Sequence, residues 1–183
     1  MSNYARRSYP LFLLALLPLL TGCPFLPQTV DHVDLDRYLG LWYEIASYPT
    51  FFNEGLVGTT AEYTLRRDGR IRVYNSAFAG DFDGPVEDIE GIATVIDRRS
   101  NAKLSVSFPS VPLGRLFQGQ YWIIDLDEED YSYAVVTNPL RTTLFILSRS
   151  PEMDPDVLDG ILDRLEEQNF DLSRLLFTPQ LAS

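Results

Sequence analysis

Apolar and polar residues alternate with a period of two along most of the chain after residue 40, which is the pattern of half-buried strands. Eight such segments follow one another, each bounded by turn-forming residues. They cover residues 41–48, 58–66, 71–78, 88–97, 102–108, 119–126, 131–137 and 142–149. Asp68-Gly69, between the second and third segments, is a strong hairpin signal. The short connections predict that neighbouring strands run antiparallel.

After residue 150 the period changes to that of a helix. Asp154 is a suitable N-cap, and Pro155 suits the first helical position. Apolar residues then recur every three or four positions, namely Val157, Leu158, Ile161, Leu162 and Leu165. The pattern predicts one helix that ends near Asn169, followed by a short last strand over residues 175–177.

The eighth strand is apolar on both faces, because Leu144 and Ile146 alternate with Phe145 and Leu147. One face can line a barrel while the other packs against the helix. Consecutive antiparallel strands can close into a barrel that leaves no free edge. The sequence therefore predicts an all-β fold: an eight-stranded antiparallel up-and-down β-barrel with one C-terminal α-helix packed on the outside. Such a barrel is either filled by its own side chains or able to hold one small ligand.

Gly40, Trp42 and Arg149 predict how the barrel is closed. Gly40 permits a tight turn into the first strand, and Trp42 follows two residues later. Arg149, at the end of the eighth strand, can lie on the indole face, a contact worth about 0.5 to 2 kcal/mol. We expect these three residues to seal one end of the barrel.

The N-terminus has the features of a secretory signal. Arg6 and Arg7 precede an apolar run over residues 10–20, which is too short to span a bilayer. The tail Leu20-Thr21-Gly22-Cys23 resembles a bacterial lipobox, and this resemblance implies cleavage before Cys23 and acylation of that residue. An ordinary signal peptide that happens to end near a cysteine is the alternative. We expect residues 1–22 to be removed, residues 23–35 to form a solvated tether, and residues 36–179 to form the barrel and helix.

Acylation of Cys23 predicts that the protein is anchored to a membrane without crossing it, since several acyl chains hold a protein firmly. The next residue is Pro24 and not the aspartate associated with inner-membrane retention in enteric bacteria. The outer membrane of the bacterial envelope is therefore the favoured location.

Composition excludes several classes of function. Cleavage would remove Arg6 and Arg7 but no acidic residue, which leaves 13 basic side chains against 26 acidic ones. A nucleic-acid partner is unfavourable for such a surface. Cys23 is the only cysteine and His32 the only histidine, so a disulfide, a catalytic triad or a histidine metal site is not expected. Paired carboxylates remain as a catalytic alternative, but we expect a protein that is not an enzyme and needs no cofactor or metal.

Three segments together resemble the signature motifs of the lipocalin family. They are Gly40-Leu41-Trp42-Tyr43-Glu44-Ile45-Ala46, Tyr131-Ser132-Tyr133-Ala134-Val135-Val136 and Leu144-Phe145-Ile146-Leu147-Ser148-Arg149-Ser150-Pro151. The second departs from the family pattern, because Glu129-Asp130 stands where a Thr-Asp pair usually leads. With the lipobox, the chain resembles a bacterial lipocalin of the outer-membrane lipoprotein type, which is similar to apolipoprotein D.

The resemblance implies that the barrel binds, stores or transports a small hydrophobic ligand such as a fatty acid or a lysophospholipid. Alternation and the family pattern predict the residues that face this ligand: Glu44, Leu104, Val106, Phe108, Tyr121, Ile123, Phe145 and Leu147. On the sixth strand, Trp122 and Ile124 fit the inner face nearly as well as Tyr121 and Ile123. A barrel filled completely by these side chains is the other alternative, which would favour a ligand-free structural or assembly lipoprotein.

For two acidic residues, one loop and the oligomeric state, the sequence allows two interpretations. Glu44 either orients a ligand or is a solvated or salt-bridged residue, and Glu62 raises the same question. Phe51 and Phe52, in the loop after the first strand, form a lid or membrane-contacting lip, or else a small packed cluster. A homodimer is left open.

Overall fold

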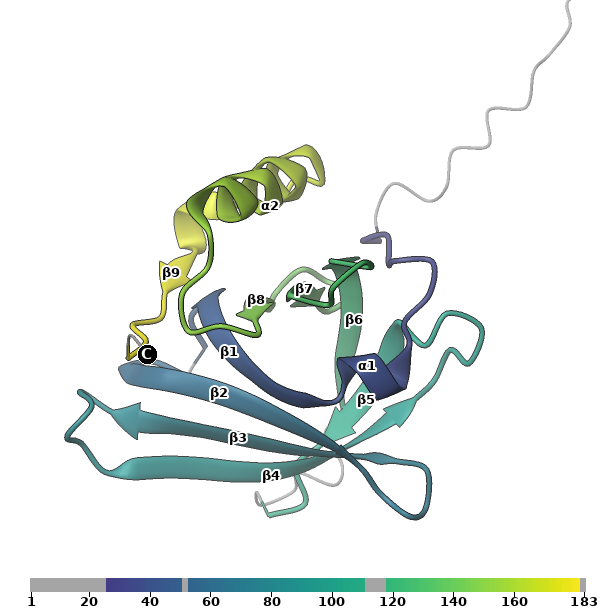
Figure 1. Cartoon of the computed structure of the whole chain (residues 1–183), viewed down its shortest axis with the longest axis horizontal. Coiled ribbons are helices and arrows are strands. Elements are labelled where there is room, and N and C mark those ends of the chain that lie inside the picture. The colour runs from purple at the N-terminus through teal and green to yellow at the C-terminus, as the bar shows by residue number, and fades with distance from the viewer. Residues whose placement is uncertain (1–25, 51–52, 111–117, 182–183) are drawn as a thin grey trace, which may run out of the picture.

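The computed structural model describes residues 26–50, 53–110 and 118–181. Within these residues, eight antiparallel strands form a closed barrel with one long helix outside it, as the sequence predicts (Figure 1). The strands are β1 Gly40–Ser47, β2 Leu56–Leu65, β3 Ile71–Ala79, β4 Val86–Val95, β5 Lys103–Ser107, β6 Gln118–Leu126, β7 Tyr133–Thr137, β8 Leu144–Ser148 and the short β9 Leu176–Phe177. The helices are α1 Leu35–Tyr38, α2 Pro155–Glu167 and the single turn η1 Leu172–Arg174. Cys23, Phe51, Phe52 and residues 111–117 lie outside the described residues.

Each strand pairs with the next one in sequence, and β8 returns to β1, which also pairs with β2. The register places Trp42 opposite Ala61, Ala61 opposite Asn75, and Asn75 opposite Ile89. Residues opposite each other on paired strands point to the same side of a sheet. This register therefore carries the inner face of β1 across to β4.

The helix α2 covers the outer face of one side of the barrel. Asp154 caps it by accepting a hydrogen bond from the Asp156 amide at 2.8 Å, and Pro155 occupies its first turn. Its buried residues Ile161 and Leu165 pack in a cluster with residues of β1, β6, β7 and β8. That cluster contains Ile45, Ala46, Trp122, Ile124, Val135, Leu144 and Ile146. The structure thus places Trp122 and Ile124 outside the barrel.

The segment before β1 differs from the solvated tether that the sequence predicts. Val33 is fully buried in the barrel core, and its amide donates to the Ser100 carbonyl at 2.7 Å. The Val30 amide donates to the Ile123 carbonyl at 3.1 Å. Asp34 then caps α1 through hydrogen bonds from the Asp36 and Arg37 amides. Residues 30–35 are therefore part of the fold, because Val33 is buried in the barrel core and the segment bonds to the barrel.

The C-terminal segment completes the wall where β1 leaves β2. The two strands pair only from Gly40 to Tyr43, and an irregularity between Glu44 and Ala46 bends β1 onward. There β9 pairs with β1, and the Thr178 amide donates to the Ile45 carbonyl at 2.9 Å. The Gln180 side chain donates to the Glu44 carbonyl at 2.8 Å and to the Thr59 carbonyl at 2.9 Å. This side chain thus links β1 to β2.

None of the helices in the described ranges combines the length and the apolar character needed to cross a bilayer.

Candidate functional site

The predicted clasp of Gly40, Trp42 and Arg149 forms at the closed end. The guanidinium carbon of Arg149 lies 3.7 Å from the centre of the indole ring of Trp42. Its nitrogens donate to the carbonyls of Leu41 at 2.7 Å and of Arg37 at 2.7 Å, with two further bonds to the carbonyls of Tyr38 and Leu39. Gly40 has a φ of +95°, and a Cβ there would lie 3.4 Å from Arg149 Nη1. The Arg149 side chain thus donates hydrogen bonds to four backbone carbonyls at the end of α1 and just after it.

The structure places all eight predicted ligand-facing residues on the inner face of the barrel. Leu104, Val106, Ile123 and Leu147 are buried there in one apolar cluster with Trp42. The remaining four also point inward, but with different surroundings: Phe108, Tyr121 and Phe145 are partly exposed, whereas Glu44 is buried among hydroxyl groups.

Burial along the inner face changes from the closed end towards the open end. Tyr63 and Val73, which are opposite each other, are buried. Ala61, Asn75 and Ile89 form the next register row towards the open end, and each is partly exposed. Because these side chains face inward, the exposure indicates open space inside the upper half of the barrel.

Gly91 allows one aromatic residue to lie across the inner wall. A Cβ at Gly91 would lie 2.8 Å from the ring of Phe108, which is too close for the ring to stay in place. Glycine therefore permits the Phe108 ring to pack on the backbone of β4. The position of this ring sets the shape of the interior beside β5.

A cluster of three tyrosines, which sequence reasoning did not find, lies at the floor of the barrel. The Tyr121 hydroxyl lies 2.7 Å from the Tyr38 hydroxyl and 3.0 Å from the Tyr63 hydroxyl. The Tyr38 ring stands 5.1 Å from the Trp42 ring and 5.7 Å from the Tyr63 ring, measured between centres. We call Tyr38, Tyr63 and Tyr121 the tyrosine trio.

Burial raises the pKa of each tyrosine in the trio, so the hydroxyl groups stay protonated well into the alkaline range. It raises the pKa of Tyr63 to about 12, and it raises the pKa of Tyr38 and of Tyr121 well above their ordinary value of 10. For Tyr63, the alternation on β2 could have predicted an inward side chain, because Tyr63 lies two residues after the inward-facing Ala61. Tyr38 precedes the first strand, so no periodic pattern assigns it to the interior.

Glu44 is held by hydroxyl groups, and it makes no ion pair within the described residues. Its Oε1 accepts from the Ser47 hydroxyl at 2.8 Å and from the Thr178 hydroxyl at 2.6 Å. Burial raises the pKa of Glu44, and these two hydrogen bonds partly offset that effect. The salt-bridged or solvated interpretation of Glu44 does not apply. Glu62, which raised the same question, is exposed on the outer face.

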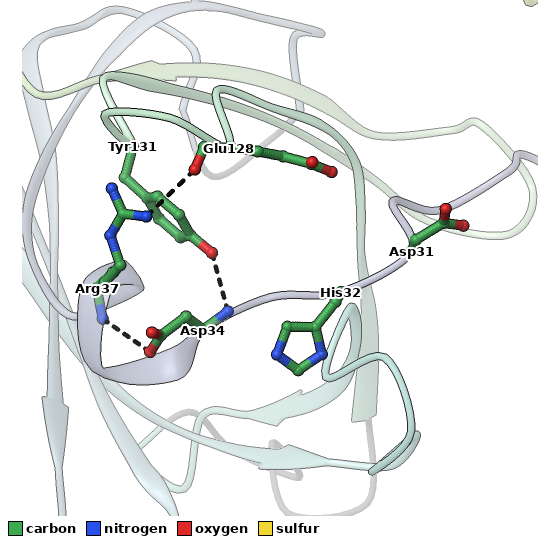
Figure 2. Close-up of a pocket in the computed structure, with 6 residues that line it drawn as sticks. All are labelled: Asp31, His32, Asp34, Arg37, Glu128 and Tyr131. Atoms are coloured by element: carbon green, nitrogen blue, oxygen red, sulfur yellow. Dashed lines mark hydrogen bonds between the residues drawn. The ribbon is translucent and has the colours of Figure 1, made fainter.

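A separate pocket of about 330 Å³ lies outside the barrel near α1 and is lined by Asp31, His32, Asp34, Arg37, Glu128 and Tyr131 (Figure 2). The Arg37 guanidinium stacks on the Tyr131 ring at 4.1 Å and donates to the Glu128 carbonyl at 3.2 Å. The Asp34 amide donates to the Tyr131 hydroxyl at 2.9 Å. Across the described part of the chain, no three acidic, histidine or cysteine side chains are grouped so as to hold a metal ion.

Known proteins share both the sequence pattern and the fold. The lipocalin-like domain family matches residues 33–180. An outer membrane lipoprotein Blc from Vibrio cholerae is 36% identical over 173 residues, which cover 93% of this chain and 98% of the relative. The Blc protein of Escherichia coli K12 is 38% identical, with coverage of 84% and 83%. Apolipoprotein D from Bos taurus is 30% identical, with coverage of 88% and 84%.

Solved structures of lower identity show the same fold. Insecticyanin from the tobacco hornworm Manduca sexta superposes with a TM-score of 0.67 at 22% identity and covers 85% of each chain. Lobster apocrustacyanin A1 has a TM-score of 0.65 at 18% identity, with coverage of 86% of this chain and 92% of that chain. The fold is therefore shared well beyond the range of close sequence similarity.

Proposed function

Because this chain belongs to the lipocalin family, we propose that it binds a small hydrophobic ligand, such as a fatty acid or a lysophospholipid, inside its barrel. In this proposal it stores or transports the ligand at the bacterial envelope and catalyses no reaction. The relatives named as outer membrane lipoproteins support the location.

One observation carries the binding proposal: apolar side chains that face inward are partly exposed in the upper half of the barrel. Ala61, Ile89 and Phe145 lie there, above the buried floor. A pocket that is mostly apolar and has a few polar groups is typical of sites for small ligands. Burying an alkyl chain in such a space contributes about 0.8 kcal/mol per methylene.

A pair of neighbouring substitutions tests where the ligand lies. Ala61 faces inward and Glu62 faces outward on the same strand. We expect Ala61→Trp to fill the interior and to weaken binding of a fluorescent fatty acid at least tenfold. Glu62→Trp introduces the same ring on the outside and should leave binding unchanged. Equal affinity in both variants, or no binding by the unmodified protein, would contradict the proposal.

The anchoring part of the proposal depends on Cys23. Acylation of this residue would hold the protein to the outer membrane, because several acyl chains together give stable attachment. We expect radiolabelled palmitate to be incorporated into the protein, and the Cys23→Ser variant to lose both the label and its sedimentation with outer membranes. Unchanged membrane sedimentation of the variant would overturn this part and leave the binding proposal intact.

A further inference from the structure

The tyrosine trio joins three distant parts of the chain at one point inside the barrel. Tyr38 comes from α1, Tyr63 from β2 and Tyr121 from β6. Their hydroxyl groups meet through two hydrogen bonds of 2.7 and 3.0 Å. Phenylalanine would fill nearly the same volume without any polar atom. Packing alone therefore does not account for the three hydroxyl groups.

A count of protons shows what the trio can still do. Each neutral tyrosine hydroxyl has one proton to donate. Three hydroxyl groups therefore have three protons, and the two bonds between them use two. At least one proton remains for an acceptor outside the trio, and a buried donor without an acceptor is unfavourable by about 1 to 3 kcal/mol.

The electrostatic environment of the trio favours an acceptor that carries negative charge or a strong dipole. The guanidinium of Arg149 lies behind Trp42 and is close enough to act on the hydroxyl groups of Tyr38 and Tyr63. Among the acidic residues, only Glu44 is buried in the described part of the chain, and the hydroxyl groups of Ser47 and Thr178 bind its Oε1. The floor of the barrel thus combines an unshared hydroxyl proton with the nearby Arg149 cation, while the Glu44 carboxyl acts on Tyr63 in the opposite sense.

Part of the Tyr121 side chain is accessible at the inner face, although its hydroxyl group is buried with those of Tyr38 and Tyr63. Tyr121 is only partly buried although it faces inward, whereas Tyr38 and Tyr63 are buried at 4% and 8% exposure. Its neighbours on the inner face are apolar: Leu104 lies directly opposite on β5, and Ile123 follows on β6. A polar atom that reached this point would find the hydroxyl groups of the tyrosine trio in otherwise apolar surroundings.

We propose that the tyrosine trio binds the hydrogen-bond-accepting end of the ligand, a carboxyl group or an ester carbonyl, so that a lipid lies with its polar end at the floor and its chain towards the open end. This inference rests on the proposed function, since it assigns an orientation to the ligand bound in the barrel. It also assigns selectivity: lipids whose polar end accepts a hydrogen bond bind more tightly than hydrocarbons of equal length.

The two tryptophans of the chain allow a direct test of this orientation. Trp42 lies at the floor against Tyr38, and Trp122 lies outside the barrel under α2. The variant Trp122→Phe leaves Trp42 as the single fluorescent reporter. Bromine quenches an indole only at short range, so its position along a bound chain can be measured.

The experiment compares two hexadecanoic acids at saturation, with the full-length Trp122→Phe protein in phospholipid nanodiscs. One acid carries bromine beside the carboxyl group, and the other carries it on the terminal carbon. We expect the first to quench Trp42 at least twice as strongly as the second. Stronger quenching by the terminal bromine would overturn the inference while leaving the proposed function intact. Absence of binding by either acid would overturn both.

A second measurement tests the hydroxyl groups themselves. Tyr121→Phe removes the central hydroxyl and keeps the ring, and we expect it to weaken binding of hexadecanoic acid about threefold to tenfold, as for one lost hydrogen bond. Tyr43→Phe is the matched control, because Tyr43 lies on β1 beside Trp42 but points outward. Binding of hexadecane should change in neither variant. An equal loss for acid and hydrocarbon in Tyr121→Phe would indicate a packing effect only and would contradict the inference.

Discussion

The guanidinium of Arg149 lies on the indole ring of Trp42 at 3.7 Å while it donates hydrogen bonds to four backbone carbonyls between residues 37 and 41. The planar shape of arginine allows both interactions at once, since its edge donates while its face stacks. Lysine has neither the plane nor enough donors in a fixed arrangement. The closed end of the barrel therefore depends on the shape of this side chain and not only on its charge.

We predict that Arg149→Lys lowers the free energy of unfolding by about 1 to 3 kcal/mol, because most of the four carbonyls, two of them partly buried, lose their donor. Urea unfolding followed by far-ultraviolet circular dichroism measures this change. Arg70→Lys is the control, since Arg70 is exposed and pairs with Asp68 on a hairpin. Equal stability of Arg149→Lys and the unmodified protein would show that charge alone is sufficient.

Gly91→Ala should disturb the interior through Phe108. The new Cβ would meet the ring at 2.8 Å, so the ring must move, and overpacking of this kind costs about 1 to 3 kcal/mol. Phe108→Leu should restore part of that loss in the double variant, which a double-mutant cycle in urea would measure. Gly119→Ala is a matched control, because the nearest atom there is 3.7 Å away. If the losses of the two single variants simply add in the double variant, residues 91 and 108 do not interact, which would contradict the prediction.

Glu44→Gln should flatten the dependence of stability on pH. Burial raises the pKa of Glu44 above its ordinary value of 4.5, so the folded protein retains this proton to a higher pH than the unfolded chain does. The stability linked to that proton is present below 4.5 and is lost as the pH rises through the folded pKa. Urea unfolding over a pH series should therefore show a steeper decline for the unmodified protein than for Glu44→Gln. The exposed Glu62→Gln serves as control, and parallel curves for all three proteins would refute the prediction.

Gln180→Ala should loosen the wall between β1 and β2. Its side chain donates to carbonyls on both strands, and each hydrogen bond contributes about 0.5 to 1.5 kcal/mol. We expect faster hydrogen exchange at the Gly58 and Thr178 amides, which bond the same segment to the barrel. Leu181→Ala, one residue later and exposed, should leave exchange unchanged. Unchanged exchange in Gln180→Ala would mean that β9 alone holds the segment.

The sequence predicts the barrel and most of its inner face because strict alternation leaves few choices. It does not settle β6, where Tyr121 and Ile123 compete with Trp122 and Ile124. Both faces of this strand are apolar because α2 covers the outer one, and only the pairing of Leu104 with Tyr121 decides between them.

Other parts of the site depend on contacts that have no local pattern. Val33 stands between the polar residues His32 and Asp34, and its burial depends on packing against distant residues of the core. The tyrosine trio joins residues separated by as many as 83 positions. Thr178 reaches Glu44 across 134 positions. Periodicity reports which face a residue occupies, but it does not report which distant residue it will meet.

If Cys23 is acylated as proposed, the hydrogen bond from the Val30 amide to the Ile123 carbonyl limits how far the barrel can move from the bilayer. The seven residue steps between Cys23 and Val30 span at most roughly 25 Å when fully extended. In that proposed arrangement the anchor would join the barrel near its closed end, and the open end would face away from the membrane that holds Cys23. A ligand bound as proposed would then leave into the aqueous space, where a second membrane or another protein would have to receive it.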